Sequence, residues 1–334
     1  MTQDDLFRTI SGGNLRLTVL RYGARVHAIE VLDEKTQRVF DPVVGYGDLR
    51  HYLTDQNYLG AVVGRTAGRI VGAEYHDGVA KRRLTRNASP HCLHGGIGFS
   101  NRYWEWGANR GDAVGLSYTS TSGEDGFPGE TRVDVIYAIV DESTIRVTYS
   151  AEATERTPLN MTQHTYFNLH QESGRGIESH EIQVLSDSFV PIADDWVPEC
   201  LLLPVERGCD LQRPRPIARV VRESRLGHGD LYRVIGESGA KQEPSSTVRP
   251  VAYLRDPVTQ RFVEVRSSQP FVQIYTGIGL ASKHFSKQAR PLRAFDGIAI
   301  ECQHVSNGVN CKVFDPPWLD RGDRYHHVLE WCFG

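Results

Sequence analysis

The sequence predicts an all-β protein whose strands form antiparallel sheets in a sandwich or a barrel. Apolar and polar residues alternate in several segments, among them residues 15–19, 145–152 and 263–266. Successive side chains of a strand point to opposite faces, so each segment would have one buried face and one face in water. Antiparallel sheets commonly face water on one side, which favours them over a parallel sheet.

Closely spaced turns separate these segments and support the same fold class. Turns are expected at residues 11–13, 123–126 and 256–259, and the chain contains 32 Gly and 16 Pro. Glycine supplies a positive φ angle and proline fixes φ at such corners. No long stretch has apolar residues at helical spacing, so only short helical turns are expected, near residues 46–53 and 281–287. Many short strands joined by such turns are typical of a sandwich or barrel.

Length and charge place the chain among globular proteins. Its 334 residues carry 38 Lys and Arg against 41 Asp and Glu, a formal net charge of −3. This balance argues against a nucleic-acid-binding protein, whose usual feature is a strongly basic surface. No repeat or linker divides the chain, so we expect a single domain over residues 1–334. Residues 207–250 have the least regular pattern and are expected to form a loop or surface strand.

The amino-terminal segment and the cysteines predict a cytoplasmic protein. Residues 1–11 lack the basic start and apolar core of a secretory signal, and no run of about 18 apolar residues predicts a membrane span. None of the cysteines is spaced as C-x-x-C, and six are too few for a disulfide framework. We therefore expect reduced thiols, with a zinc site as the weaker alternative. The cysteines are Cys92, Cys200, Cys209, Cys302, Cys311 and Cys332.

The motifs of several common enzyme classes are missing from the sequence. It contains neither the G-x-x-x-x-G-K-[ST] phosphate loop nor the H-E-x-x-H zinc motif. The G-x-S-x-G nucleophile elbow is missing as well. The commonest nucleotide-dependent, metalloprotease and serine-hydrolase functions are therefore not favoured.

Two ionisable side chains stand among apolar and aromatic neighbours and could transfer protons. On a strand, His164 would share a face with Thr162 and Tyr166, and an imidazole both donates and accepts a proton near neutral pH. Glu301 directly follows an apolar strand segment, and burial raises the pKa of a carboxyl group toward the range of a neutral-pH base. Taken alone, His164 is better explained as a structural histidine, and Glu301 equally well as a strand-end residue that reaches water.

Two further segments offer candidate ligand-binding groups. His94 precedes Gly95 and Gly96, and glycine lets a backbone approach a ligand closely. Arg65 and Arg69 lie in the segment 64–70. A turn that presents a surface histidine, and plain surface charges, are the alternative explanations.

Together, six segments in the same order resemble those of the aldose 1-epimerase family, the galactose mutarotases. The most specific is the segment TQHTYFNL at residues 162–169, which is intact. The others resemble the family's GR-x-x-N-R-I, LHGG, G-[FY]-P-G, Q-I-Y-T-G and E-x-Q segments, and lie at residues 64–70, 93–96, 126–129, 273–277 and 301–303. Their common order along nearly the whole chain makes a chance resemblance improbable.

The resemblance implies a large antiparallel β-sandwich of the galactose mutarotase-like type, with few short helices and a sugar cleft on one concave face. It also implies an isomerase of carbohydrate metabolism that interconverts the α and β anomers of a free aldose. His164 stands at the general acid and Glu301 at the general base. His94 would hold the region of the ring oxygen, while Arg69 and Gln273 would bind sugar hydroxyls. No metal and no organic cofactor is implied.

Two departures from the family pattern bear on the substrate. The family usually has Asn before its second arginine, where this chain has Gly68, so one hydroxyl contact is missing or supplied elsewhere. The family's Gly-x-Asp-His segment is replaced by residues 227–232, in which Asp230 lies one position late. We assign Asp230 a substrate-binding role. Both departures suggest a sugar other than the commonest hexose.

Two alternative functions stay open at this point. A sugar-phosphate 1-epimerase would need a basic pocket, for which the arginines from Arg213 to Arg225 are the candidates. A non-catalytic sugar-binding protein is not excluded by the fold, although binding alone needs no acid–base pair. Trp104, Tyr166 or Tyr275 would stack on the sugar, and each would fit a hydrophobic core equally well. The expected partner is a small sugar, with no nucleic acid or membrane, and no oligomeric state is predicted.

Overall fold

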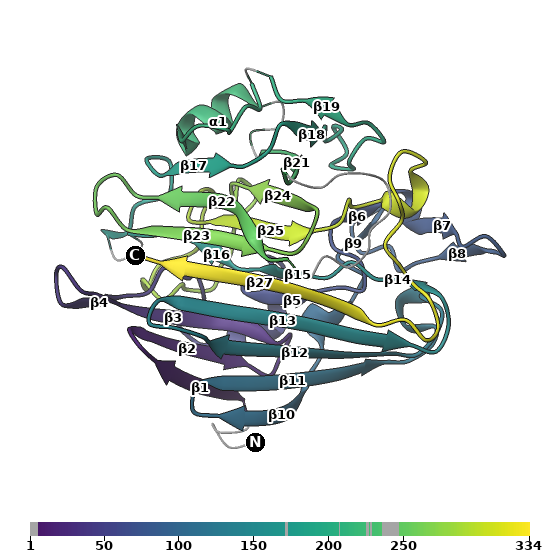
Figure 1. Ribbon diagram of the computed structural model, residues 1–334, viewed down its shortest axis with the longest axis horizontal. Helices are drawn as coiled ribbons and strands as arrows, with labels where there is room; N and C mark the ends of the chain where they lie inside the picture. The colour runs from purple at the N-terminus through teal and green to yellow at the C-terminus, as the bar shows by residue number, and fades with distance from the viewer. Residues whose placement is uncertain (1–5, 171–172, 207, 225–226, 228, 236–246) are drawn as a thin grey trace.

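Two large antiparallel sheets dominate the computed structural model (Figure 1). The structure describes residues 6–170, 173–206, 208–224, 227, 229–235 and 247–334. Within these residues the larger sheet has nine strands and the second has six. A four-stranded sheet at the amino terminus and several two-stranded ladders complete the fold.

The bounds of the elements follow, with the strands of each sheet in spatial order. The nine-stranded sheet consists of β10 (Glu105–Arg110), β11 (Ala113–Ser120), β12 (Thr131–Ile139), β13 (Thr144–Ala153), β27 (Tyr325–Phe333), β23 (Phe262–Ser267), β22 (Arg249–Arg255), β17 (Glu181–Val184) and β20 (Arg215–Pro216). The six-stranded sheet consists of β16 (Tyr166–Phe167), β25 (Ile298–Gln303), β24 (Phe271–Tyr275), β21 (Leu231–Arg233), β18 (Ser188–Val190) and β19 (Leu203–Pro204).

The smaller elements connect and cover these sheets. The amino-terminal sheet consists of β1 (Phe7–Gly12), β2 (Leu15–Leu20), β3 (Arg25–Asp33) and β4 (Arg38–Phe40). The two-stranded ladders pair β15 (Thr162–His164) with β5 (Ala61–Val63), β6 (Arg69–Ile70) with β9 (Cys92–Leu93), β7 (Glu74–His76) with β8 (Lys81–Arg83), and β14 (Thr157–Pro158) with β26 (Trp318–Leu319). The helical segments are α1 (Ile217–Glu223) and the 3₁₀ turns η2 (Leu49–Thr54), η3 (Val71–Ala73), η4 (Phe99–Asn101), η5 (Glu124–Gly126) and η7 (Gly308–Asn310).

The alternation seen in the sequence matches the two faces of the long strands. In β12, Val133, Val135 and Tyr137 are buried, whereas Arg132 before them and Ile136 between them are exposed. The same alternation runs through β13, which pairs with β12 in an unbroken antiparallel register. The prediction of an all-β antiparallel fold is therefore confirmed, and the layered sheets decide for a sandwich.

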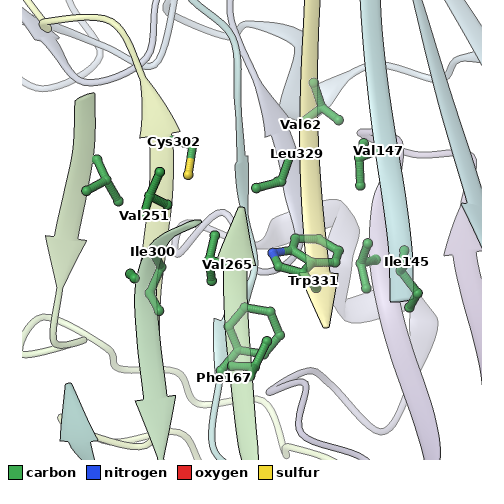
Figure 2. Close-up of a cluster of buried hydrophobic side chains, with 14 of the residues drawn as sticks. Val62, Ile145, Val147, Phe167, Val251, Val265, Ile300, Cys302, Leu329 and Trp331 are labelled. Carbon is green, nitrogen blue, oxygen red and sulfur yellow. The ribbon is translucent and has the colours of Figure 1, made fainter. Parts of the chain in front are cut away.

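The main core is built from residues of the nine-stranded, six-stranded and amino-terminal sheets. Figure 2 shows side chains from β13, β23 and β27 of the nine-stranded sheet meeting side chains from β16 and β25 of the six-stranded sheet. The Phe167 ring meets the Trp331 indole edge to face, with their centroids 5.6 Å apart. Burying a large apolar side chain contributes roughly 1.5–3 kcal/mol relative to its exposure, so this layer holds the six-stranded sheet in place.

Strand β25 is buried on both of its faces, and this positions the site. Ile298, Ile300 and Cys302 belong to the core between the sheets. Because side chains alternate along a strand, Glu301 and Gln303 point to the opposite face, where they line a cavity. One face of this sheet therefore supplies stability and the other supplies polar groups.

The helical expectations are partly wrong. The turn expected near residues 46–53 corresponds to η2, but residues 281–287 form no helix and are shaped by two isolated bridges, Tyr46 with Ser286 and Phe285 with Pro291. The region 207–250, expected to be irregular, contains α1, whose two buried apolar residues are too few for a helical pattern in the sequence. None of the described helices is both long and apolar enough to cross a membrane.

The expectation that all cysteines are reduced is also wrong, because Cys200 and Cys311 form a disulfide. Among the described residues the other four cysteines are free thiols, and three of them are buried. The two bridged residues lie 111 positions apart, so no local spacing in the sequence announces the pair. Cys200 follows Pro198, and Cys311 lies near Ser306, so the bridge joins two segments that both line the cavity.

Reduction of this bridge is expected to lower the midpoint of thermal unfolding. A cross-link that closes a long loop restricts the unfolded chain and typically stabilises a protein by about 2–4 kcal/mol. Calorimetric scans with and without a phosphine reductant measure the shift. The Cys200→Ser/Cys311→Ser variant is the control and should not respond to the reductant. Equal midpoints for the wild type in both conditions would contradict the prediction.

Candidate active site

A cavity opens on the face of the six-stranded sheet that points away from the core. Its walls come from β6, β9, β15, β16, β24 and β25 and from neighbouring loops. Five of the six site residues expected from the sequence line it, and Asp230 does not. The lining residues are Gln56, Asn57, Tyr58, Gly68, Arg69, Leu93, His94, His164, Tyr166, Ile192, Trp196, Pro198, Gln273, Tyr275, Gly279, Glu301, Gln303 and Ser306.

Glu301 is a buried carboxyl group that lines this cavity. It lies on β25 directly opposite Gln273 of β24 in the antiparallel register, so both side chains face the cavity. Its residue is only 4% exposed. Burial raises the pKa of the Glu301 carboxyl to about 8, while the nearby Arg69 guanidinium acts to lower it. Such a group exchanges its proton near neutral pH, as a general acid or base must.

His164 meets Glu301 from a different ladder. It ends β15, which pairs with β5, and its Nε2 lies 3.7 Å from Oε1 of Glu301. Burial lowers the pKa of the His164 imidazole to about 4. Its Nδ1 is buried and has no hydrogen-bond partner among the described residues. The polar contact of the ring is therefore the one between its Nε2 and Glu301. The imidazole and the carboxyl group therefore form an acid–base pair.

The backbone around His94 fixes which ring nitrogen of this residue carries the proton. The backbone N–H of Gly68 donates to Nδ1 of His94 at 3.1 Å. Burial lowers the pKa of His94 well below its ordinary value, and its neighbours His164 and Arg69 act in the same direction. In the neutral ring an accepting Nδ1 leaves the proton on Nε2. His94 is therefore a hydrogen-bond donor through Nε2.

The glycine after His94 is required by a close backbone approach. A Cβ on Gly95 would lie 2.2 Å from the carbonyl oxygen of Gly64, and Gly95 has a φ of +79°. Only glycine fits such a contact in the left-handed region without strain. The Leu93–Gly96 motif thus serves to bring His94 beside the segment of Arg65 and Gly68.

Arg69 supplies the positive charge of the cavity. Its guanidinium carbon lies 5.6 Å from the ring centroid of Trp196, and an arginine held over an aromatic face is attracted by the ring quadrupole. Burial lowers the pKa of the Arg69 guanidinium, but an arginine side chain keeps its charge in proteins at neutral pH. Arg69 is therefore placed to bind an oxygen and to stabilise the ionised form of Glu301.

Gln273 lines the cavity and Asp230 does not, although the two residues are hydrogen-bonded. Gln273 donates through Nε2 to the backbone oxygens of Asp230, at 3.2 Å, and Ile274, at 2.7 Å, which leaves its Oε1 as an acceptor. Asp230 precedes β21, whose Leu231 pairs with Gln273, and it is not among the residues that line the cavity. Burial raises the pKa of the Asp230 carboxyl to about 6, while a hydrogen bond from the backbone of Ile192, a residue of the cavity wall, acts to lower it. Asp230 therefore lies next to the cavity wall without lining the cavity.

The aromatic and arginine candidates divide between the cavity and the core. Tyr166 and Tyr275 line the cavity. Trp104 is fully buried in the core, where its indole N–H donates to the backbone oxygen of Phe99. Arg65 is also buried, and its guanidinium donates to the backbone oxygens of Pro128 and Gly129 and to Ser120. Arg65 therefore holds the 126–129 turn in place and does not face the cavity.

Two buried groups within the described residues have the donor types of a metal site. One is His94, His164 and Glu301, whose ligand atoms lie within 4.8 Å of one another. The Nδ1 of His94 is already occupied by a backbone N–H, and the Arg69 charge acts on Glu301 and would repel a cation. These contacts suit proton transfer better than metal binding.

The second group is a hydrogen-bond network whose residues do not line the cavity. It contains His170, His180 and Asp256. Asp256 accepts from the Thr259 backbone N–H and hydroxyl and lies 3.0 Å from Nδ1 of His170. Nε2 of His180 accepts from the backbone N–H of Leu169, while its Nδ1 is buried without a partner among the described residues. Because protein groups engage Asp256, His170 and Nε2 of His180, these contacts favour a structural role.

Sequence reasoning missed several residues that line the cavity. Tyr58, Trp196 and Ser306 come from loops and belong to none of the six motifs. Tyr58 and Trp196 both adopt positive φ angles, 56° and 67°, which no residue pattern in the sequence indicates. Gln303 lies inside the last motif, but the motif alone indicates no role for it. His228 and Arg225 lie outside the described residues.

Comparisons with known proteins find relatives along nearly the whole chain. The family model for aldose 1-epimerase matches residues 5–331. Galactose mutarotase from Sus scrofa is 31% identical, with 97% of this chain and 92% of the relative covered. Aldose 1-epimerase from Haemophilus influenzae is 30% identical, with coverages of 85% and 83%.

Solved structures show the same fold. An aldose epimerase homologue from C. elegans superposes with a TM-score of 0.88 at 24% identity, covering 98% of both chains. Galactose 1-epimerase from Lactobacillus acidophilus gives a TM-score of 0.80 at 20% identity, covering 98% of this chain and 93% of the other. The family match spans nearly the whole sequence, as does the likeness to the curated relatives, so this chain belongs to the aldose 1-epimerase family.

Proposed function

We propose that this protein interconverts the α and β anomers of a free aldose by acid–base ring opening and closure. The observation that carries the proposal is the contact between Glu301 and His164, 3.7 Å apart at their closest polar atoms. Both lie in a cavity whose other polar groups suit sugar hydroxyls. A pair of this kind provides the two proton transfers that anomerisation needs.

Ring opening requires one proton to leave the sugar and another to arrive. Glu301 takes the proton of the C1 hydroxyl, while His164 delivers a proton to the ring oxygen as the C1–O bond breaks. The product is the open-chain aldehyde. The C1–C2 bond then rotates, and the hydroxyl that was the ring oxygen attacks the other face of the carbonyl. His164 takes back the proton of this hydroxyl, and Glu301 returns its proton to the carbonyl oxygen, which becomes the C1 hydroxyl.

The pKa values of the pair indicate where its proton lies before substrate binds. Burial raises the pKa of Glu301 to about 8 and lowers that of His164 to about 4. Between these values the pair holds one proton, and the carboxyl group carries it. The reactive form, with ionised Glu301 and protonated His164, contains the same single proton. Its formation needs a proton transfer from Glu301 to His164, against the order of their two pKa values. The Arg69 charge, which acts to lower the pKa of Glu301, reduces the cost of this transfer.

The remaining polar residues bind and orient the sugar. His94 donates through Nε2 to the region of the ring oxygen, and Arg69 and the Oε1 of Gln273 bind hydroxyl groups. Tyr166 and Tyr275 supply aromatic surface beside the pair. Asp230 is assigned no direct sugar contact, because it does not line the cavity, and its backbone oxygen accepts from the Gln273 side chain. Positioning of this kind lets the proton transfers act on one bound conformation of the ring.

The cavity is less suited to the two alternative functions. Arg213, Arg215, Arg219 and Arg222 lie outside the cavity lining, and Arg215 and Arg219 pair with Glu223. A sugar phosphate would find only the single guanidinium of Arg69 among the lining residues of the described chain. A protein that only binds sugar would not need a buried carboxyl group, which is costly to ionise.

Polarimetry of freshly dissolved α-anomers tests the proposal. The panel contains glucose, galactose, xylose and arabinose, each with and without the protein. We expect a faster approach to equilibrium with at least one free aldose, and weaker inhibition by hexose 6-phosphates than by free hexoses. Anomerisation of sugar phosphates alone would favour the first alternative. Calorimetric binding of sugar without any acceleration would establish a binding protein.

A cytoplasmic location stays a prediction. The Cys200–Cys311 bridge counts against it, because disulfides persist mainly in oxidising compartments. Thiol labelling of the protein in cells of its source organism would decide the matter. Full labelling of both cysteines would support the cytoplasm, and protection of both would contradict it.

A further inference from the structure

Gly68 leaves a space in the cavity wall that another side chain fills. Its φ is +69°, and a Cβ at this position would lie 1.9 Å from Oγ of Ser306. The two residues are 238 positions apart in number, from Gly68 to Ser306, and both line the cavity. Any larger residue at position 68 would displace the Ser306 hydroxyl. The missing side chain and the added hydroxyl are therefore one structural feature.

Ser306 is held in this place by Gln303. The Nε2 of Gln303 donates to Oγ of Ser306 at 2.7 Å. Gln303 is 1% exposed and Ser306 is 4% exposed, so water has little access to either residue. Because the serine oxygen accepts from Gln303, its own hydrogen is left to donate to another group.

The other end of the Gln303 amide is an acceptor that nothing in the described protein satisfies. Its Oε1 is buried and has no hydrogen-bond partner. Buried polar side-chain atoms are partnered in the large majority of cases, so each exception calls for an explanation. The pair thus contains one acceptor without a partner among the described residues and one hydroxyl hydrogen that remains to be donated, and both residues line the cavity. A sugar hydroxyl, which both donates and accepts, matches this combination.

The position of the pair on β25 indicates which hydroxyl it meets. Gln303 follows Glu301 by two residues on the same face of the strand, a spacing of about 6.6 Å along the strand. If Glu301 acts at C1, groups at this distance reach across the ring to its far side. The hydroxyls on C3 and C4 lie there, whereas the ring oxygen and the C2 hydroxyl lie next to C1.

We propose that Gln303 and Ser306 bind one hydroxyl on C3 or C4 of the aldose, and that Gly68 exists to make room for the Ser306 hydroxyl. This inference rests on the proposed function, because it takes an aldose as the ligand. It makes Gln303 and Ser306 determinants of which aldose is accepted. They recognise a hydroxyl and take no part in the proton transfers.

Ser306→Ala, assayed with deoxy sugars, tests the proposed contact. With the parent aldose we expect kcat/KM to fall by roughly 3- to 10-fold, the usual worth of one neutral hydrogen bond, mainly through a higher KM. With the 3-deoxy or the 4-deoxy analogue the variant and the wild type should be equal, because the contacted hydroxyl is already missing. An equal loss with every analogue, or no loss with any, would overturn the inference.

An exchange of side chains tests the role of Gly68. Asn adopts the left-handed region more readily than most residues, so Gly68→Asn should fail mainly through its clash with Ser306. Adding Ser306→Gly should recover sugar binding relative to Gly68→Asn alone. No recovery would contradict the shared space. Ser188→Ala is the matched control for Ser306→Ala. Ser188 is a buried serine outside the cavity lining, so this variant should bind and convert the sugar as the wild type does.

Calorimetric titration of the parent aldose separates this inference from the proposed function. If the wild type binds the aldose but does not accelerate its anomerisation, the proposed function fails and the ratio of Kd values for wild type and Ser306→Ala still tests the contact. If the wild type is active, we expect the ratio of Kd values to match the change in kcat/KM caused by Ser306→Ala. A wild type that binds no aldose overturns both.

Discussion

Glu301→Gln is expected to lower kcat/KM for anomerisation by about 10²- to 10⁴-fold, the usual worth of a positioned general base. The amide keeps the shape of the carboxyl group but cannot accept the C1 proton. Glu301 is 4% exposed and is paired with Gln273 in the sheet. Because glutamine has nearly the same size and shape, it should fill the same space, so the change should leave the fold intact. Polarimetry at saturating and limiting sugar measures the loss.

The same variant is expected to be more stable than the wild type at alkaline pH. The folded pKa of Glu301 is raised to about 8 from an ordinary value of 4.5, so folding favours the protonated group. The stability that this provides is present below the ordinary pKa and is lost as pH rises toward the folded pKa. A neutral amide avoids the loss, so the gain in Tm should be larger at pH 8 than at pH 5.

Glu330→Gln is the matched control for this experiment. Glu330 is 6% exposed, pairs with Arg146 and lies outside the cavity lining. It should keep full activity and gain no stability, because its ion pair is lost. Unchanged activity in Glu301→Gln would show that another group accepts the C1 proton. Inactivity together with a lower Tm would indicate damage to the fold instead.

His164→Gln is expected to cause a second loss of about 10²- to 10⁴-fold in kcat/KM, because glutamine cannot deliver a proton to the ring oxygen. The residue ends β15 and lies 3.7 Å from Glu301. Groups that act together are not additive, so the double variant Glu301→Gln/His164→Gln should lose little more than the worse single variant. Losses that multiply would mean that the two residues act independently.

His327→Gln controls for the replacement of a buried histidine. His327 is 2% exposed, burial lowers its pKa to about 3, and it contacts the Ser268 hydroxyl outside the cavity. This variant is expected to lose stability and to keep its kcat. If it lost as much activity as His164→Gln, the effect at residue 164 would be structural.

The fold class could be predicted because period-two patterns depend only on which face of a strand is buried. The choice between sandwich and barrel could not be made from these patterns alone, since they do not say which strands pair. In β25, for example, Ile300 and Glu301 are both buried. No single buried face exists there, and only the two layers around the strand explain its pattern.

In the site, too, residues inside short motifs could be predicted, whereas residues placed by contacts distant in the sequence could not. His164, Glu301, His94, Arg69 and Gln273 lie in short motifs that the resemblance covers, and the structure brings all five to one cavity. That these residues act as described stays a proposal. The motifs alone did not fix how the chain between them runs.

Residues outside the motifs show where sequence reasoning ended. The sequence predicts that Asp230 binds the sugar, but in the structure it does not line the cavity, and its backbone oxygen accepts from Gln273. Ser306 and Trp196 reach the cavity through loops. Their positions depend on contacts with Gly68 and Arg69, far away in the chain. The Cys200–Cys311 pair was missed for the same reason.

The dependence of kcat/KM on pH tests the shared proton of Glu301 and His164 most directly. Below about pH 4 His164 binds a second proton and the pair no longer accepts one, and above about pH 8 Glu301 loses the proton that the pair must donate. Polarimetry from pH 3 to pH 10, corrected for the uncatalysed reaction, should therefore give a plateau with limbs near these two values. A rate that rises steadily through pH 8, or no acceleration at any pH, would contradict the account.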